Sequence, residues 1–393
     1  MDAPLVIGMV GAGQLARMTH QAAIALDLDL RLLAARPDDG AAQVSPRVEI
    51  GDPGSGPDLA RFAAICDVVT FDHELVDLDA LARLEAAGTT ARPSAAALAH
   101  ATDKAHQRRR LAAAGLPLPR HVVVADTDGL ARVGDDLGWP LVIKSARGGY
   151  DGRGVWMVAG PDAAAEVVAQ LAAGGTEAVV EERIDLRTEL AVVVVTRPGG
   201  DRVVYPAVET VQVDGICREV LAPAPLDPAV LDEADAVARE VADVVGAVGV
   251  LAVELFWDGR RVLVNEVATR PHNSGHWSIE GAVTSQFANH LRAVADLPLG
   301  DPAMVAPVAV CANVLGAADG RDPLAGLAAA LAVRGASVHL YGKDARPGRK
   351  VGHVTVIGDD LPSARRRAAA AVAALGDPVP GAPASTDGEG SAR

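Results

Sequence analysis

Two apolar runs on either side of Asp258-Gly259 constrain the fold more than any other stretch. Apolar and β-branched residues dominate Val250–Trp257, and a second run follows the turn. Apolar runs that flank Asp-Gly are typical of a β-hairpin. This hairpin carries Glu254 on one strand and Glu266 on the other, and carboxylates in such strands repel each other unless a cation lies between them. Paired oxygen ligands suit Mg²⁺, which takes one or two carboxylates together with phosphate oxygens.

Strand register decides whether the two carboxylates can share an ion, because side chains alternate between the faces of a strand. A regular two-residue turn would place Glu266 opposite Leu251, on the other face from Glu254. A three-residue loop would place Glu266 opposite Ala252, on the same face. We therefore predict a loop or a bulge that shifts the register by one residue.

A polar segment, Arg270-Pro-His-Asn-Ser-Gly-His276, follows the hairpin directly. It offers a fixed cation, two imidazoles, an amide and a hydroxyl within seven residues. We interpret it as a surface for an anionic ligand beside the metal. The alternative is a solvated loop that follows a hairpin with an accidental acidic pair.

Composition limits the functions that the chain can have. Its 393 residues are enough for two or three domains, and 50% of them are hydrophobic but only 3% aromatic, so Ala, Val and Leu must build the core. A net charge of −15 argues against nucleic acid or an anionic membrane as the main partner. Cys66, Cys217 and Cys311 are scattered, as expected for thiols in a reducing compartment. Without a signal peptide or a run of 18 apolar residues, the chain is expected to be cytoplasmic.

The N-terminal part has a βαβ pattern: a strand at 5–10, the turn Gly11-Ala-Gly-Gln-Leu-Ala-Arg17, a helix at 15–25 and a strand at 28–33. The turn fits a dinucleotide-binding fingerprint that places a phosphate at a helix N-terminus, with Asp38 as the ribose partner. An NAD-dependent dehydrogenase is thus one alternative, although it leaves Lys144 and the acidic pair unexplained. Asp72 and Glu74 follow the strand at 67–71, where parallel sheets bind ligands; a local helix N-cap is the alternative.

The middle of the chain predicts a cover for phosphate groups. A helix from Ala95 is expected to run on into the basic residues 104–110, with Arg109 and Arg110 on a solvated face. A strand at 139–145 delivers Lys144, a glycine-rich loop spans 146–154, and a strand follows at 155–158. Glycines let backbone N–H groups approach phosphate oxygens closely. The alternative, a mobile hairpin turn, does not explain a lysine within an apolar strand.

The remaining pattern predicts further strands and helices. Strands are expected at 178–184, 188–195, 306–315 and 336–340, with a strand pair at 206–220. Helices are expected at 227–245, 282–295 and 363–374. Basic residues gather at 341–353, and we predict that Lys343, Arg349 and Lys350 fold back onto the Gly11–Arg17 turn to share one phosphate.

Taken together, the motifs resemble the ATP-grasp superfamily, and in detail its 5-(carboxyamino)imidazole ribonucleotide synthase family, over residues 5–356. Three motifs carry the resemblance most specifically: Gly149-Tyr-Asp-Gly-Arg-Gly154, Arg270-Pro-His-Asn-Ser-Gly-His-Trp277 and Arg346-Pro-Gly-Arg-Lys-Val-Gly-His353. The resemblance implies an α/β fold with a Rossmann-like N-terminal domain at 1–96, an ATP-grasp domain at 97–296 with its flap at about 120–185, and a small C-terminal domain at 297–376. Residues 377–393 are expected to form a disordered tail, and the enzyme to be a homodimer.

The implied activity is carboxylation of 5-aminoimidazole ribonucleotide in purine biosynthesis. ATP and bicarbonate would form carboxyphosphate, with Mg²⁺ as cofactor and Mn²⁺ as an alternative ion. A formate-dependent glycinamide ribonucleotide transformylase, another ATP-grasp ligase, is the alternative; its hinge, flap and metal residues would look alike.

The resemblance also implies a role for each matched residue. Glu254 and Glu266 would hold the metal. The predicted ATP-binding residues are Lys104, Lys144, Gly149, Tyr150, Asp151, Gly152, Arg153, Gly154, Glu181, Glu182, Arg183, Ile184, Glu189, Asn265 and Glu266. The predicted catalytic residues are Arg270, His272, Asn273, His276, Tyr150, Asp151 and Arg153. The predicted ribonucleotide-binding residues are Gln14, Leu15, Asp72, Glu74, Lys343, Arg349 and Lys350. The chain departs from the family pattern at Asp72, usually Glu, at Lys104, usually Arg, and at Thr269, usually Pro.

Overall fold

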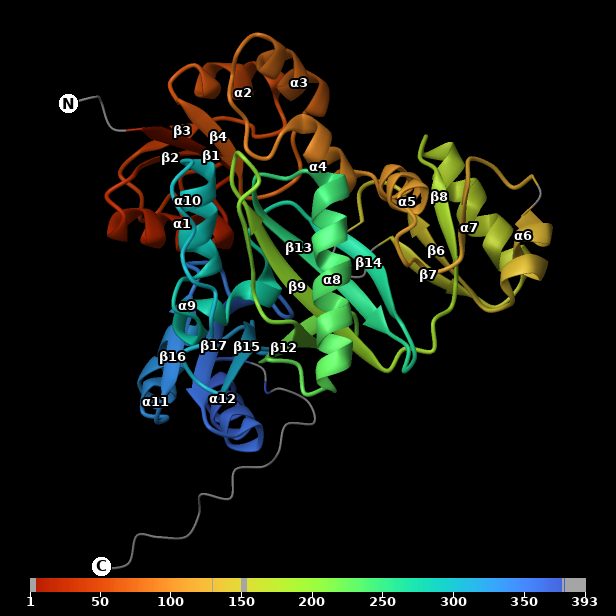
Figure 1. Cartoon of the computed structure of the whole chain (residues 1–393). Coiled ribbons are helices and arrows are strands. Elements are labelled where there is room, and N and C mark those ends of the chain that lie inside the picture. The colour runs from red at the N-terminus through yellow and green to blue at the C-terminus, as the bar shows by residue number, and fades with distance from the viewer. Residues whose placement is uncertain (1–4, 129, 150–153, 377, 379–393) are drawn as a thin grey trace, which may run out of the picture.

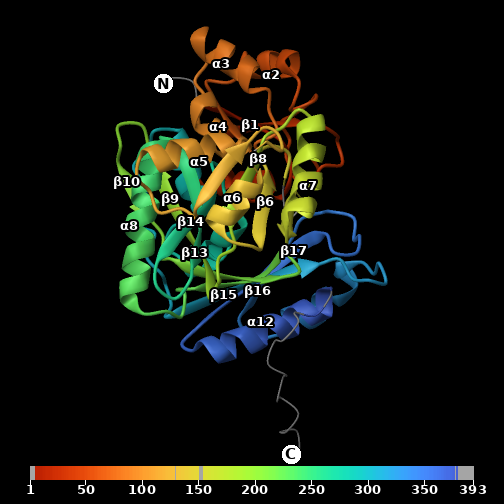
Figure 2. The same cartoon turned by 90° about the vertical axis from the view of Figure 1, so that its right-hand side faces the viewer.

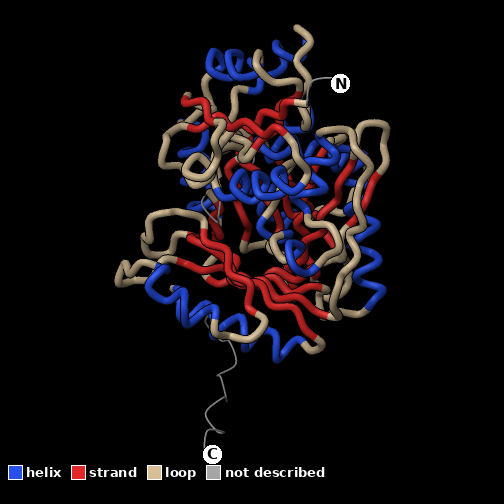
Figure 3. The backbone as a smooth tube through the Cα atoms, turned by 90° about the vertical axis from the view of Figure 1, so that its left-hand side faces the viewer, coloured by secondary structure: helices blue, strands red, loops and turns tan. Residues whose placement is uncertain are grey.

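The computed structural model describes residues 5–128, 130–149, 154–376 and 378. Within these residues the strands form three sheets, each covered by helices (Figure 1). The strand-rich centre lies between helical layers (Figure 3). No helix in the described part is long and apolar enough to cross a membrane.

The N-terminal sheet is parallel, with the strand order β3-β2-β1-β4. Its strands are β1 (Val6–Val10), β2 (Asp29–Ala34), β3 (Val48–Ile50) and β4 (Val68–Phe71), and its helices are α1 (Gln14–Ala25), α2 (Gly56–Ala63) and α3 (Leu78–Ala86). The strand order reverses at β1, so a crevice is expected beyond the carboxyl ends of β1 and β4. The Gly11–Gln14 turn and Asp72 lie at these two ends.

The predicted helix from Ala95 into the basic residues is in fact two helices, α4 (Ala95–Thr102) and α5 (Lys104–Ala113). Asp103 between them has an extended backbone, with φ −133° and ψ 101°. Its carboxylate accepts a hydrogen bond from the His106 N–H at 2.9 Å, as an N-cap residue does. This break turns α5 away from α4 and towards the second sheet.

The second sheet, in the segment predicted to form the flap, has the antiparallel order β5-β8-β6-β7. Figure 2 shows its strands β6 and β8 beside α7. Its strands are β5 (His121–Val124), β6 (Leu141–Ser145), β7 (Val155–Val158) and β8 (Ala178–Glu182), and α6 (Leu130–Leu137) and α7 (Pro161–Ala173) pack on it. An apolar core that includes Leu141, Ile143 and Val180 holds the strands to α7. Lys144 points away from this core, because it alternates with Ile143 along β6.

The third sheet is the largest, with nine strands in the order β14-β13-β9-β11-β12-β15-β17-β16 and with β10 paired to β9. Its strands are β9 (Thr188–Thr196), β10 (Arg202–Val204), β11 (Val208–Val213), β12 (Ile216–Ala222), β13 (Gly249–Trp257), β14 (Val262–Ala268), β15 (Val308–Leu315), β16 (Ala336–Leu340) and β17 (Lys350–Gly358). The helices around it are α8 (Pro228–Val245), α9 (Ser278–Gly281), α10 (Gln286–Val294), α11 (Leu327–Leu331) and α12 (Leu361–Leu375), with short 3₁₀ turns at Asn273–Gly275 and Pro323–Gly326. Because the C-terminal strands continue the sheet of the central hairpin, the basic residues near β17 are held in a fixed place relative to it.

The expected helix at 282–295 is shorter than predicted. Ala282 forms a β-bridge with Met304, and a bend at Val283 and Thr284 follows, in which Val283 donates a backbone hydrogen bond to the Ala303 carbonyl. Ser285 then caps α10, accepting a hydrogen bond from the Ala288 N–H at 3.1 Å. The apolar pattern alone did not reveal this start, because residues 282–284 are also apolar or β-branched.

The predicted register shift of the central hairpin is confirmed, but not by the predicted loop. Trp257 pairs with Val262, which leaves a four-residue loop at 258–261 instead of a three-residue one. Ala252 consequently pairs with Ala268 and not with Glu266. The shift comes from a bulge further along the strands.

The extra residue of this β-bulge is Asn265. Glu254 pairs with Glu266, whereas Leu255 pairs with Val264. Residues that pair directly across an antiparallel ladder project to the same face. Both carboxylates therefore leave the hairpin on one side.

Candidate active site

The two carboxylates of the hairpin lie side by side and perturb each other. Burial, and then the charges of Glu266 and Glu189, raise the pKa of Glu254 to about 8. Burial also acts to raise the pKa of Glu266, but the Lys104 and Lys144 ammonium groups outweigh it, so the net shift is downward. Lys104 Nζ lies 2.5 Å from Glu266 Oε2. Glu254 is therefore held largely protonated at neutral pH, although two lysines lie nearby. Both acids could be ionised together only if further positive charge, such as a cation, lay beside them.

Lys144 belongs to a buried ion cluster beneath this face. Its Nζ lies 2.8 Å from Glu181 Oε2 and donates to Asn265 Oδ1 at 2.9 Å. Burial lowers the pKa of Lys144, while Glu181 opposes the shift. The bulge at Asn265 thus directs an amide oxygen at the lysine.

Arg108, which belongs to none of the predicted site residues, completes this cluster. Its Nε lies 2.6 Å from Glu181 Oε1, and its Nη2 donates to the Asn265 carbonyl at 2.6 Å. The side chains of Arg108 and Glu181 are only 2% and 3% exposed. One signal was available: Arg108 follows Lys104 by four residues, which places both on one face of a helix. The neighbouring Arg109 pairs with Glu177 on the solvated face, as predicted.

The predicted adenine hinge lies at the end of β8, between the flap sheet and the large sheet. Glu181 is buried in the ion cluster, so its side chain already has two cationic partners. Glu182 accepts hydrogen bonds from the backbone and side chain of Arg120, at 2.9 and 2.8 Å. Arg183 and Ile184 follow β8, the first exposed and the second half-buried. Both residues lie beyond the end of β8, in the segment that leads to β9.

Glu189, the predicted ribose ligand, stands at the start of β9 and pairs across the sheet with Phe256. Burial raises its pKa, and Glu266 raises it further. It therefore belongs to the same electrostatic cluster as the acidic pair. The flap loop above it is described only at its ends: Gly149 and Gly154 are present, with Gly154 at φ +75°, whereas the predicted Tyr150, Asp151, Gly152 and Arg153 lie outside the described residues.

The Arg270–His276 segment packs against the acidic pair. His272 Nε2 lies 3.3 Å from Glu254 Oε1. Arg270 Nε lies 2.8 Å from Glu74 Oε2, a residue of the N-terminal part. Burial acts against the charge of Arg270, but Glu74 outweighs it and raises the arginine pKa. The guanidinium thus joins the hairpin site to the N-terminal crevice.

Of the other two predicted catalytic residues of this segment, His276 lies deeper than Arg270 and His272, whereas Asn273 is half-buried like them. His276 is fully buried, and its ring lies 5.0 Å from that of His353 and 5.7 Å from that of Phe287. Burial lowers the pKa of His276 well below its usual value, so the ring is neutral. Asn273 Oδ1 is buried and has no hydrogen-bond partner among the described residues.

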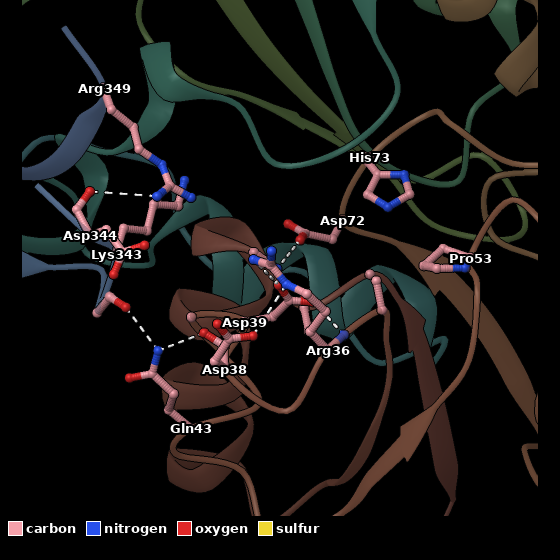
Figure 4. Close-up of a pocket in the computed structure, with 16 residues that line it drawn as sticks. Arg36, Asp38, Asp39, Gln43, Pro53, Asp72, His73, Lys343, Asp344 and Arg349 are labelled. Atoms are coloured by element: carbon pink, nitrogen blue, oxygen red, sulfur yellow. Dashed lines mark hydrogen bonds and ion pairs between the residues drawn. The ribbon is translucent and has the colours of Figure 1, made fainter. Parts of the chain in front are cut away.

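A polar cavity of about 310 Å³ lies at the carboxyl ends of β1 and β4 (Figure 4). The predicted fold-back of the C-terminal basic cluster is confirmed for two residues: Lys343 and Arg349 line this cavity together with Gly11–Gly13. Lys343 Nζ donates to Gln14 Oε1 at 2.5 Å. Arg36, which is not among the predicted site residues, also lines the cavity and pairs with Asp38 and Asp39.

Lys350 and Leu15 take different places from the residues around the cavity. Lys350 begins β17, and its charge acts on Glu254 and His276, which places it towards the hairpin site. Leu15 is 7% exposed and packs with Met18 and Tyr341 in an apolar cluster. Its side chain therefore shapes the wall behind the cavity.

Asp72 occupies the position that a dinucleotide phosphate would take. Its carboxylate accepts hydrogen bonds from the N–H groups of Gly13 and, at 3.0 Å, of Ala16. The dinucleotide alternative, with a phosphate at the N-terminus of α1, is therefore disfavoured, because the N–H groups of Gly13 and Ala16 already donate to the Asp72 carboxylate. The local N-cap alternative for Asp72 and Glu74 is wrong, since the next helix begins at Leu78 and is capped by Asp77.

Comparison with known proteins agrees with this arrangement. Family models match three consecutive segments: the ribonucleotide synthetase preATP-grasp domain at 5–102, the ATP-grasp domain at 109–287 and the phosphoribosylaminoimidazole carboxylase C-terminal domain at 309–367. The N5-carboxyaminoimidazole ribonucleotide synthase of Mycobacterium tuberculosis (strain ATCC 25618 / H37Rv) is 51% identical over 374 residues, which cover 93% of this chain and 86% of the relative.

Two solved structures are similar over nearly the whole chain. The N5-carboxyaminoimidazole synthase of Aspergillus clavatus, in complex with ADP and 5-aminoimidazole ribonucleotide, matches with a TM-score of 0.87 and 33% identity, over 95% of this chain and 99% of that one. The N5-carboxyaminoimidazole ribonucleotide synthetase of Thermus thermophilus matches with a TM-score of 0.85 and 36% identity, over 95% and 99%. The chain therefore belongs to the N5-carboxyaminoimidazole ribonucleotide synthase family, ATP-grasp ligases that carboxylate 5-aminoimidazole ribonucleotide in purine biosynthesis.

Proposed function

We propose that the enzyme carries out this carboxylation through carboxyphosphate. A bicarbonate oxygen attacks the γ-phosphorus of ATP, the bond to the β-phosphate oxygen breaks, and ADP leaves. Carboxyphosphate then splits into CO₂ and phosphate, and the exocyclic amine of the ribonucleotide captures the CO₂ and loses a proton. The observation that carries the proposal is that one arginine, Arg270, lies between the acidic pair and the crevice of the N-terminal sheet.

ATP is proposed to lie between the flap sheet and the hairpin. Lys144 and Lys104 present their ammonium groups on this side, where they would contact phosphate oxygens. Lys104 is a point charge at a position where the family pattern noted above usually has an arginine, so it would bind a phosphate with a single group and not in bidentate fashion. The ends of the glycine loop, Gly149 and Gly154, would close over the phosphates.

The residues of the hairpin fit a divalent cation. Glu254 and Glu266 are paired on one face, and their mutual repulsion adds to burial in raising the Glu254 pKa to about 8. Among the described residues no group of three or more His, Cys, Asp or Glu side chains could hold a metal, so two carboxylates plus phosphate oxygens form the expected set. When bound, Mg²⁺ would neutralise the charge that develops on the transferring phosphoryl group. Mn²⁺ is an alternative with the same oxygen ligands.

Arg270 and His272 are proposed to surround the carboxyphosphate. Arg270 offers a fixed positive charge to the carboxylate or the departing phosphate, and electrostatic stabilisation of this kind is the main source of phosphoryl-transfer catalysis. His272 keeps its Nε2 beside Glu254, from where it can donate a hydrogen bond to a ligand oxygen next to that carboxylate. Asn273, whose buried Oδ1 has no described partner, is the remaining polar group of the segment.

The ribonucleotide is proposed to occupy the cavity of Figure 4. Lys343 and Arg349 would bind its 5′-phosphate, and Arg36, which is paired with Asp38 and Asp39, also lines the cavity. Asp72 would not contact the phosphate, since its carboxylate is held by the α1 amides. Glu74, paired with Arg270, would lie between the ribonucleotide and the carboxyphosphate.

We further propose the domain boundaries given by the resemblance, a homodimeric assembly and a cytoplasmic location.

Product analysis with ¹⁴C-bicarbonate tests the proposed function. With ATP, Mg²⁺ and 5-aminoimidazole ribonucleotide, label should enter the ribonucleotide in proportion to ADP released. ADP release that instead requires formate and glycinamide ribonucleotide would identify the transformylase activity and overturn the proposal.

A further inference from the structure

The side-chain amide of Gln286 is fully buried and bound to the backbone of the active-site segment. Its Nε2 donates to the His272 carbonyl at 2.7 Å, and its Oε1 accepts from the His272 N–H at 3.0 Å. It thereby satisfies both backbone polar groups of one residue, as a neighbouring β-strand would. The same Nε2 lies 3.3 Å from His276 Nδ1.

Gln286 itself is held rigidly. It is the first residue of α10, and its backbone N–H donates to Ser278 Oγ at 2.9 Å. Ser278 Oγ in turn donates to the Gly275 carbonyl at 2.6 Å. Two connections therefore run from the start of α10 to the segment, one through the side chain of Gln286 and one through its backbone.

Gly275 shows how closely the amide fits. A Cβ added at this position would overlap the Oε1 and Cδ atoms of Gln286. The glycine in the His-Asn-Ser-Gly-His motif is therefore required by the amide and not by its own backbone angles, since its φ is not positive.

We call the two hydrogen bonds between the Gln286 amide and the His272 backbone the clamp. The clamp fixes the backbone from which the imidazole of His272 projects. Ser274 contacts His272 Nδ1 through its hydroxyl at 2.9 Å and through its N–H at 3.4 Å. An Nδ1 that accepts from a backbone N–H leaves the proton on Nε2, which faces Glu254 at 3.3 Å. With its backbone bound to Gln286 and its Nδ1 bound to Ser274, the ring has one orientation.

We propose that Gln286 is a positioning residue for the carboxylation, which holds His272 in register with Glu254 so that carboxyphosphate is used for transfer to the amine and is not lost to water. The inference rests on the proposed function, in which His272 borders the carboxyphosphate. Without the clamp, ATP would still bind and be cleaved, because its lysine contacts lie on other elements. The product formed per ADP would fall.

The same helix offers a matched control, Asn289. It is also fully buried, and it binds both backbone groups of Gly300, accepting from its N–H at 2.7 Å and donating to its carbonyl at 3.1 Å. It lies one turn further along α10 and also donates to the Tyr205 hydroxyl at 2.8 Å. Its removal deletes an equivalent clamp that does not touch the active-site segment.

The test compares Gln286→Leu with Asn289→Leu in the full chain, measuring labelled product per ADP, the KM for ATP and the melting temperature. Gln286→Leu should lower product per ADP about tenfold or more, because displacement of a catalytic group by about 1 Å costs on the order of 100-fold. Its KM for ATP should stay within about twofold. Asn289→Leu should lower the melting temperature comparably but keep the wild-type ratio.

The positioning role would be overturned if Gln286→Leu formed as much labelled product per ADP as the wild type, or if Asn289→Leu lost as much of it as Gln286→Leu. Either result would leave the proposed function standing. If Gln286→Leu does not fold, Gly275→Ala takes its place: the added methyl group displaces the amide, so the ratio should fall, and an unchanged ratio would overturn the inference. A wild-type enzyme that does not carboxylate the ribonucleotide would overturn the proposed function, and the inference with it.

Discussion

Replacement of Glu181 by Gln should destabilise the enzyme by about 3 kcal/mol. Glu181 is the carboxylate between Arg108 and Lys144, and burial opposes its charge, but these two cations outweigh burial and lower its pKa from 4.5 to about 2. A difference of this size corresponds to about 3 kcal/mol. Removal of one partner from a buried ion pair costs about 3–5 kcal/mol, so the two estimates agree.

Urea titration followed by tryptophan fluorescence measures this loss, because Trp139 and Trp156 pack in the same flap subdomain. The matched control is Glu177→Gln, whose partner Arg109 lies next to Arg108 on α5 but is 54% exposed. An exposed pair contributes about 0–1 kcal/mol, so the control should change little. Equal effects of the two substitutions would refute the account of the buried cluster.

The pH dependence of the wild type follows from the same shift. Because the folded pKa of Glu181 is depressed, its stabilisation is fully present above pH 4.5 and is lost as the pH falls towards 2. In Glu181→Gln this part of the acid transition should disappear.

Three further predictions concern other parts of the structure. Lys144→Met should weaken ATP binding by about 1.5–3 kcal/mol, as expected for a charged hydrogen bond, and unchanged affinity by calorimetry would exclude its phosphate role. Lys343→Ala should raise the KM for the ribonucleotide far more than the KM for ATP, because Lys343 lines the cavity at the N-terminal sheet; equal increases would contradict that placement. Burial lowers the pKa of His290 to about 3, so its stabilising contribution is complete above pH 6.5 and is lost as the pH falls below it. His290→Leu should therefore flatten the decline in unfolding free energy between pH 6.5 and about 3. An unaltered slope in urea titrations over this range would count against this assignment.

Local pattern was enough to predict the hairpin and the need for a register shift. Two carboxylates within apolar strands can share a cation only if both lie on the same face of the hairpin. A regular two-residue turn would place them on opposite faces, so the sequence excludes it. The sequence pattern could not predict where the extra residue lies, because a bulge at Asn265 and a loop with an odd number of residues both shift the register by one. The choice depends on Arg108 and Lys144, which bind the carbonyl and amide oxygens of Asn265.

Residues whose partners lie far away in the chain were harder to assign. Asp72 caps a helix that begins 58 residues earlier, and nothing in its own neighbourhood indicates this. Asp103 breaks a stretch that is otherwise suited to a helix, since its carboxylate caps the next one. In the sequence, Gln286 looks like an ordinary residue in the first turn of a helix. Its role becomes visible only in the folded structure, where its amide binds the backbone of His272.

Oxygen transfer from bicarbonate to phosphate is the most direct test of the central claim, that carboxyphosphate forms between the acidic pair and Arg270. The enzyme is supplied with ATP, Mg²⁺, 5-aminoimidazole ribonucleotide and ¹⁸O-labelled bicarbonate, and the inorganic phosphate is analysed by mass spectrometry. Attack of bicarbonate on the γ-phosphorus followed by loss of CO₂ leaves one bicarbonate oxygen in each phosphate, so one ¹⁸O should appear per turnover. Phosphate without ¹⁸O, together with carboxylated product, would contradict the account.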